Sequence, residues 1–182
     1  YYSSATSPYK NAVSLSLDGV GEWETAKVGL WEMGKLKNHK TLGKYPHSVG
    51  LFYSAMTSFL GFKPNEGEYK VMGLSAYGNR TNLVIKMKDL IWLEDGEIRC
   101  NLNFFTWHKS DKIMFNHNLV KFLGIDFRLP NEEIKQIHKD LAWAVQNRYE
   151  EILFQILNLA YKEYKCKQLT LGGGCAYNGL AN

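Results

Sequence analysis

The chain has 182 residues, and its 22 Lys and Arg against 18 Asp and Glu give a formal net charge of +4. With 45% hydrophobic residues, this composition excludes a disordered tail, a collagen-like repeat and a small disulfide-stapled domain, and the length suits one core. The basic residues are scattered, which argues against a nucleic-acid partner, and no stretch is long and apolar enough to span a membrane.

The first part of the chain predicts a β-meander. Alternating or apolar runs predict three strands, at 12–17, 25–30 and 35–42. The first strand ends at the turn-forming pair Asp18-Gly19, a further turn is expected at Gly21, and Met33-Gly34 joins the last two strands.

Helices are predicted in the middle of the chain and again towards its end. One apolar stripe begins near Ser48 and stops at Gly61, residues that suit an N-cap and a C-cap. Shorter helices are expected at 68–76 and 83–90, followed by a hairpin around 94–97. From Asn131, apolar residues step by three or four for about 30 residues, which predicts one long helix or two stacked ones.

Two segments remain. The segment 101–130 is rich in Phe, His and Asn but has no clean period, and it is a candidate specificity insertion.

A short strand at 168–171 precedes Gly172, Gly173 and Gly174, and helical residues are expected from Cys175 onward. Three glycines let the backbone pass close to a bound group, and N–H groups at a helix start attract a phosphate, so a nucleotide is the natural guest. A tight strand-to-helix turn is the alternative.

The second candidate element is LDGVGEWE, which begins at Leu17 and contains Asp18, Gly19, Gly21 and Glu22. A carboxylate at a strand end is well placed to hold a metal ion or to orient a reacting hydroxyl, because such side chains point into a crevice. The alternative is an ordinary turn, since Asp-Gly is a common turn dipeptide.

The third candidate element is NEGEYKVMGLSAYG, which begins at Asn65. Glu68 and Lys70 lie near a helix start between Gly67 and Gly73, so Glu68 can accept from ribose hydroxyls and Lys70 can donate to phosphate oxygens. An exposed, charged helix start is the alternative.

The histidines and cysteines do not form a metal site by themselves. No pair has HxxxH or HExxH spacing, His138 is expected to be a buried structural residue, and His47 is either a cap neighbour or a cleft residue. The three cysteines form no CxxC pair, which favours a reducing compartment, the cytoplasm, and Cys175 is interpreted as a packing residue.

In this order, the elements resemble the O-carbamoyltransferase family, which includes nodulation carbamoyltransferases and the enzymes that carbamoylate aminoglycoside and cephamycin antibiotics. The matching stretches are SLDGVGEWET (16–25), YPHSVGLFYSAMTSFLGF (45–62), EGEYKVMGLSAYG (66–78) and LGGGCAYNGLAN (171–182). Ser75 and Tyr177 depart from the pattern, which has Ala and Leu there.

The resemblance implies an α/β fold of the actin/Hsp70/sugar-kinase ATPase type. It implies that the carbamoyl group of carbamoyl phosphate is first joined to the AMP part of ATP, giving carbamoyl adenylate, and then moves to a hydroxyl of a small-molecule or glycan acceptor. It also implies a metal, usually iron, held by an HxxxH pair, the aspartate that Asp18 matches and a second aspartate. Gly172 to Gly174 with Asn178 match the family's phosphate loop, and Glu68 with Lys70 match its second nucleotide motif.

The same resemblance predicts that the chain is the central part of an actin-like domain, cut at both ends. The HxxxH pair is expected before Tyr1, and the second aspartate and the domain that handles carbamoyl phosphate are expected beyond Asn182. Alone, this part is expected to be inactive. Two other hypotheses stay open: a sugar-kinase-like phosphotransferase and a non-catalytic nucleotide-binding module.

Overall fold

A computed structural model describes residues 2–110 and 113–182, and the chain divides into two compact units. Unit 1 comprises Tyr1–Gly50, Leu93–Arg99 and Ile152–Asn182, and unit 2 comprises Leu51–Trp92 and Cys100–Glu151. The architecture is mixed α/β, as the sequence predicts.

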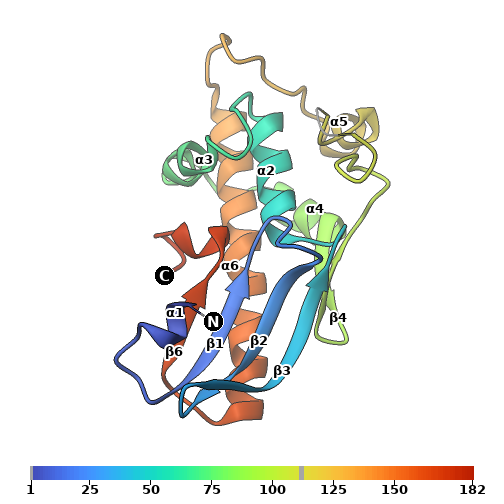
Figure 1. The fold of residues 1–182 in the computed structure, drawn as a ribbon. Coiled ribbons are helices and arrows are strands. Elements are labelled where there is room, and N and C mark those ends of the chain that lie inside the picture. Colours follow the sequence, from blue (N-terminus) through green and yellow to red (C-terminus); the bar gives the residue numbers. More distant parts are fainter. Residues whose placement is uncertain (1, 111–112) are drawn as a thin grey trace. The chain divides into compact units, whose positions relative to one another are not determined.

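Unit 1 is built on a four-stranded mixed sheet with the order β3-β2-β1-β6 (Figure 1). The strands are β1 (Asn11–Leu17), β2 (Glu24–Glu32), β3 (Lys35–Lys44) and β6 (Leu169–Gly172). β1 and β2, like β2 and β3, are antiparallel, whereas β6 runs parallel to β1. The predicted meander and the predicted last strand are therefore confirmed, each within about two residues.

Hydrogen bonds from the short helix α1 (Tyr2–Ala5) and from the end of α6 (Gln136–Tyr164) hold the two edges of this sheet. Ser4 of α1 is buried, and its Oγ lies 2.8 Å from Ser14 Oγ on β1 and 2.7 Å from Thr170 Oγ1 on β6. At the other edge, Tyr164 Oη donates to the Asn38 carbonyl of β3 over 2.6 Å. The sheet is thus anchored by polar contacts as well as by its apolar core.

Unit 2 is mainly helical. It contains most of α2 (Val49–Phe59), with α3 (Glu68–Ser75), α4 (Leu83–Leu90), α5 (His117–Leu123) and residues 136–151 of α6 (Gln136–Tyr164). Gly61 ends α2 as predicted: its φ is +74°, its N–H donates to Ser58 and the N–H of Phe62 donates to Thr57. These are the two hydrogen bonds of a Schellman motif, which requires the left-handed residue that glycine supplies.

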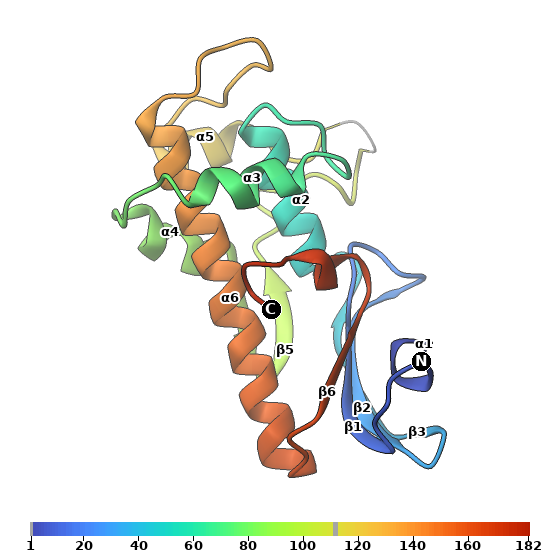
Figure 2. The same ribbon diagram turned by 90° about the vertical axis from the view of Figure 1, so that its left-hand side faces the viewer.

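The long apolar period belongs to one helix, α6, of 29 residues, which is unbroken in Figure 2. The alternative of two stacked helices is not observed, and the helix itself begins at Gln136, after the first residues of the pattern. The guanidinium of Arg128 donates to the carbonyls of Leu129, Pro130 and Glu132, so these carbonyls have hydrogen-bond partners without being part of a helix.

The segment 101–130 folds around aromatic packing instead of a periodic pattern. The rings of Phe105 and Trp107 stack with centroids 4.5 Å apart, and those of Phe104 and Phe122 lie 4.8 Å apart. Before this segment, β4 (Ile91–Glu94) and β5 (Glu97–Cys100) form the predicted hairpin. Asp95 and Gly96 have φ of +53° and +82°, as a tight hairpin turn requires.

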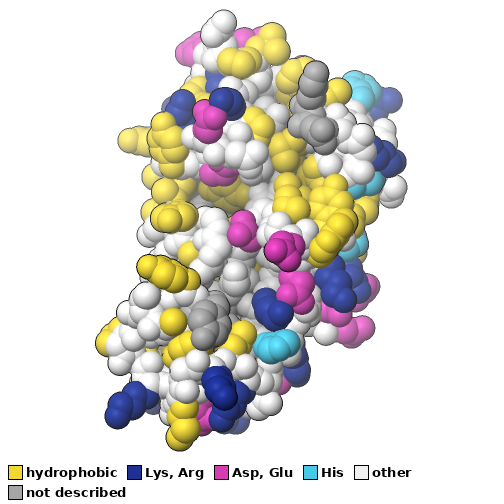
Figure 3. Space-filling view, viewed as in Figure 1, with side chains coloured by type: hydrophobic (Ala, Val, Ile, Leu, Met, Phe, Trp, Pro, Cys, Tyr) yellow, Lys and Arg dark blue, Asp and Glu magenta, His cyan; other side chains and the backbone are white. Residues whose placement is uncertain are grey.

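Charge is dispersed on the face of the molecule seen in Figure 3, where Lys and Arg side chains alternate with Asp and Glu. Among the helices of residues 2–110 and 113–182, none is both long and apolar enough to cross a bilayer.

Candidate functional site

Parallel pairing brings two of the predicted elements to one edge of the sheet in unit 1. Val13 pairs with Leu169 and Ser16 with Gly172, so β1 and β6 end next to each other. Asp18 follows β1 directly, and Gly173 and Gly174 follow β6 directly. Because ligands of open α/β sheets bind beyond the carboxyl ends of parallel strands, this edge is the candidate site.

The Asp18 side chain is half-buried and faces the glycine loop. Its Oδ1 accepts from the Gly19 N–H over 2.7 Å, and its backbone N–H donates to the Thr25 carbonyl over 2.8 Å. A Cβ placed on Gly174 would lie 3.5 Å from Asp18 Oδ1, so the carboxylate borders the loop directly. Among the described residues, no donor occupies the second carboxylate oxygen.

The start of α2 closes against the Asp18 turn, a contact that sequence reasoning missed. Ser48 Oγ donates to the Asp18 carbonyl over 3.0 Å. A Cβ on Gly50 would lie 2.7 Å from Gly19 Cα and 2.9 Å from the Asp18 carbonyl oxygen. The signal available in the sequence was Gly50 itself, because glycine inside a helix start is unfavourable unless another backbone approaches closely.

Gly173 gives the loop its shape. It has φ +84° and ψ +167°, and a Cβ there would clash with the backbone of Leu17 on β1. The Gly173 N–H has no backbone acceptor among the described residues, so it remains available to an anion. Gly172 lies in β6 itself. Gly21, with φ +58°, shapes the turn between β1 and β2.

The helix expected from Cys175 onward is wrong. The structure has only a 3-10 turn, η1 (Gly174–Tyr177), after which Asn178 has ψ +89°. Asn178 Oδ1 accepts from the Ala181 N–H over 3.2 Å, a local hydrogen bond that competes with helix formation. The loop therefore presents individual N–H groups and no helix N-terminus.

The remaining predicted residues lie on α3 in unit 2. Glu68 Oε1 accepts from Ser54 Oγ over 2.6 Å and from the Asn65 N–H over 2.8 Å, so it holds the chain where α3 begins. Lys70 Nζ lies 5.8 Å from the centre of the Phe62 ring. Gly73 is exposed, and a Cβ there would meet nothing within 4 Å. Their binding of a nucleotide stays a prediction.

The sequence raises roles for two of the histidines and for the three cysteines. His138 is buried, as predicted, and its Nδ1 accepts from the Lys135 N–H over 3.1 Å. The carbonyl of His47 accepts from Thr25 Oγ1 over 2.6 Å. Within residues 2–110 and 113–182, no group of three or more His, Cys, Asp or Glu side chains could hold a metal. Cys100, Cys166 and Cys175 form no disulfide, and the cytoplasmic location stays a prediction.

Comparisons with known proteins agree on one family. The family model described as Carbamoyltransferase N-terminus matches residues 1–182. The nodulation protein NolNO of Sinorhizobium fredii is 30% identical over 181 residues, which are 97% of this chain and 24% of that protein. The nodulation protein NolO of Bradyrhizobium diazoefficiens is 28% identical over 183 residues, 98% of this chain and 30% of that protein.

An uncharacterised protein of Synechocystis is 36% identical over 177 residues, which are 97% of this chain and 28% of that protein. The chain therefore spans between about a quarter and a third of the length of these relatives.

Proposed function

Because the chain belongs to the Carbamoyltransferase N-terminus family, we propose that the protein transfers a carbamoyl group to a hydroxyl of a small-molecule or glycan acceptor. The observation that carries this proposal is the meeting of a carboxylate and a glycine loop at the ends of two parallel strands. One group can orient a hydroxyl there, and the other can hold a phosphate, which are the two requirements of transfer from an acyl phosphate.

Unit 1 would then be part of an actin/Hsp70/sugar-kinase-like ATPase fold. In its favour are the antiparallel meander β3-β2-β1, the strand β6 added parallel to β1, and the placement of Asp18 and the glycine loop at the same edge. Folds of this type would use the loop for nucleotide phosphate.

The donor would be carbamoyl phosphate, activated with ATP. Hydrolysis of carbamoyl phosphate gives carbamate and phosphate, and the carbamate oxygen then bonds to the α-phosphorus of ATP as pyrophosphate leaves. In the resulting carbamoyl adenylate, the N–H of Gly173 in the glycine loop would donate to the phosphate. Asn178 closes the same loop through its hydrogen bond to Ala181.

Asp18 would act on the acceptor. Its Oδ1 is held by the Gly19 N–H, and its other oxygen can accept a hydrogen bond from the acceptor hydroxyl. The hydroxyl oxygen bonds to the carbamoyl carbon, the bond from this carbon to the phosphate oxygen breaks, and AMP leaves with the electron pair. The hydroxyl proton passes to solvent.

Iron is the metal that the family resemblance suggests, and Asp18 is the one ligand that this chain would offer. The fit is incomplete, because residues 2–110 and 113–182 contain no cluster of three possible ligands. The transfer step above therefore rests on hydrogen bonding by Asp18 and the glycine loop.

The test is product analysis with the full-length protein. The protein is incubated with ATP, carbon-13-labelled carbamoyl phosphate and a panel of hydroxylated acceptors. The masses of the products are then measured by mass spectrometry. One acceptor should gain a labelled carbamoyl group. Asp18→Asn should lower kcat at least about a hundredfold, since it removes a positioning carboxylate at the reacting group.

A matched control is Asp95→Asn, because Asp95 also precedes a glycine in a turn but lies in the β4–β5 hairpin. Its activity should equal that of the unaltered protein. Phosphorylated acceptor would instead favour the sugar-kinase hypothesis, and nucleotide binding without any product would favour a non-catalytic module.

A further inference from the structure

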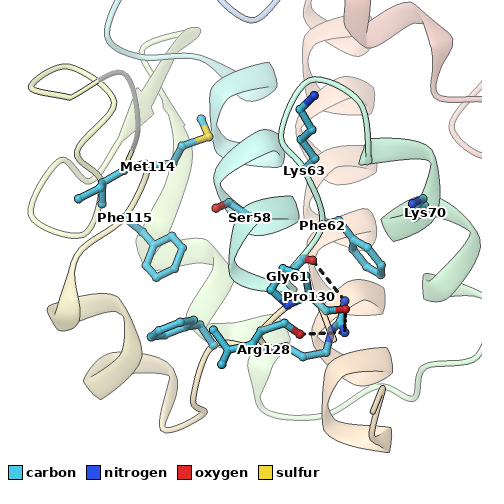
Figure 4. Close-up of a pocket in the computed structure, with 12 residues that line it drawn as sticks. Ser58, Gly61, Phe62, Lys63, Lys70, Met114, Phe115, Arg128 and Pro130 are labelled. Atoms are coloured by element: carbon cyan, nitrogen blue, oxygen red, sulfur yellow. Dashed lines mark hydrogen bonds between the residues drawn. The ribbon is translucent and has the colours of Figure 1, made fainter. Parts of the chain in front are cut away.

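A cavity separate from the Asp18 edge lies wholly in unit 2, at the end of α2 (Figure 4). Its volume is about 670 Å³, which lies within the range of small-molecule sites, about 300–1,000 Å³. Side chains from the end of α2, from α3 and from the segment 113–130 surround it; they include Phe62, Lys63, Lys70, Phe115, Phe127 and Arg128. None of them belongs to the Asp18 edge.

The cavity is lined mainly by apolar side chains, and several of these side chains are exposed to water. Ile113, Phe127 and Leu129 have 60%, 46% and 53% of their surface exposed, and all three line this cavity. Exposed apolar side chains that gather at a concave surface are typical of a binding site, because covering them releases their hydration water. Phe62 and Phe115 add two further rings to the walls.

The charge of the cavity is positive. Lys63 is neutralised by an ion pair with Glu66. Lys70 is exposed, and no described carboxylate pairs with it; its ammonium lies 5.8 Å and 5.9 Å from the centres of the Phe62 and Tyr69 rings. An anionic group of a ligand would find its partner in Lys70.

Arg128 adds a second, buried positive charge to the lining of the cavity. It is only 4% exposed, its centre lies 4.9 Å from the Phe62 ring, and its guanidinium donates to backbone carbonyls, including that of Leu60 over 2.7 Å. The carboxylate of Glu132, on the same loop, accepts from the Leu129 N–H. The buried charge is therefore met by peptide dipoles, and no described carboxylate forms an ion pair with it.

The lining offers little to a nucleotide. Apart from the three cationic residues, Ser58 is the one side chain in it that can form strong hydrogen bonds. An adenine edge and two ribose hydroxyls would lose hydrogen bonds to water there without regaining them.

We propose that this cavity binds a small organic anion whose flat apolar body packs against Phe62, Phe115 and Phe127 and whose carboxylate, phosphate or sulfonate faces Lys70. The site is separate from the proposed carbamoyl-transfer site. It assigns Lys70 to an aromatic anion and not to the nucleotide predicted from the sequence.

The test uses two fluorescent probes with the full-length protein. One is 8-anilinonaphthalene-1-sulfonate, and the other is N-phenyl-1-naphthylamine, which has the same rings without the sulfonate. Lys70→Gln should weaken binding of the sulfonate about threefold to fivefold, as expected for an exposed ion pair, and leave the uncharged probe unaffected. Phe127→Ser should weaken both probes about tenfold, since it removes an apolar wall.

The matched control is Lys63→Gln with Glu66→Gln, which removes a charge pair from the same rim without changing its net charge. It should alter neither affinity more than about twofold. The proposal would be overturned if Lys70→Gln affected both probes equally, if the control matched Lys70→Gln, if no saturable binding occurred, or if ATP displaced the sulfonate. These measurements record binding and need no catalysis. A failure of this proposal can therefore be distinguished from a failure of the proposed carbamoyl transfer.

Discussion

Gly173 places the glycine loop so close to β1 that only a hydrogen atom fits on its α-carbon. Its φ of +84° with ψ of +167° is a conformation almost confined to glycine, and a Cβ would meet the Leu17 backbone. We expect Gly173→Ala to reduce the free energy of unfolding by about 2–4 kcal/mol, the sum of backbone strain and overpacking. Urea denaturation followed by circular dichroism measures this loss.

The control is Gly179→Ala in the same C-terminal segment. Gly179 has no positive φ, and a Cβ there would meet nothing within 4 Å. This substitution should change the free energy of unfolding by less than about 0.5 kcal/mol. If both variants lost the same stability, the close approach of Gly173 to β1 would be wrong.

His138 makes stability depend on pH. Burial lowers the pKa of its imidazole, and the nearby charges of Arg128 and Lys135 lower this pKa further. Folding therefore favours the neutral ring, whose Nδ1 accepts from the Lys135 N–H. Its contribution is fully present above the ordinary imidazole pKa and is lost as the pH falls through the lowered value of the folded state.

The expected result is a smaller free energy of unfolding at about pH 5 than at about pH 7.5, with a smaller difference in His138→Gln. Some dependence should persist, because burial also lowers the pKa of His108. His117→Gln, at the exposed start of α5, is the control and should retain the full difference. An unchanged pH dependence in His138→Gln would show that protonation of His138 does not oppose folding.

At the level of elements, clear periods and turn residues were enough to predict most of the chain. The helices at 68–75 and 83–90 and the stop at Gly61 follow from local pattern and capping, which act over a few residues. The helix α5 has only seven residues, too few for a visible period. The loop before α6 is held by Arg128, whose partners are backbone carbonyls and leave no trace in the residue types.

Arg128 therefore offers a test of how this loop is held. Its guanidinium donates to the carbonyls of Leu60 and Gly61, just after α2, and to those of Pro130 and Glu132 in the loop before α6. Arg128→Met would leave several of these carbonyls unsatisfied, so we expect a loss of about 3 kcal/mol in the free energy of unfolding. In this variant, hydrogen exchange should also speed up for the backbone N–H of residue 128, which donates to the Phe59 carbonyl in the unaltered protein.

Arg99→Met provides the comparison. Arg99 forms ion pairs with Glu94 and Glu97 on the surface of the hairpin, and exposed pairs contribute at most about 1 kcal/mol. A loss at Arg128 no greater than that at Arg99 would mean that the carbonyl contacts do not stabilise the loop.

At the level of the whole molecule, the site residues predicted from the sequence fall into two groups. Asp18 and the triple glycine come together because β1 and β6 pair in parallel, although residue spacing alone gives no sign that strands so far apart in the chain are neighbours. Glu68, Lys70 and Gly73 belong to unit 2. Glu68 holds the start of α3 and Lys70 lies against the Phe62 ring, and the residue types alone predict neither contact.

The most direct test of the central claim is the nucleotide product of the full-length protein. Phosphorus NMR follows ATP in the presence of carbamoyl phosphate and an acceptor that becomes carbamoylated. Transfer through carbamoyl adenylate predicts one AMP and one pyrophosphate for each carbamoylated product, with both formed far more slowly in Asp18→Asn. ADP formed in step with product, or product formed without consumption of ATP, would contradict it.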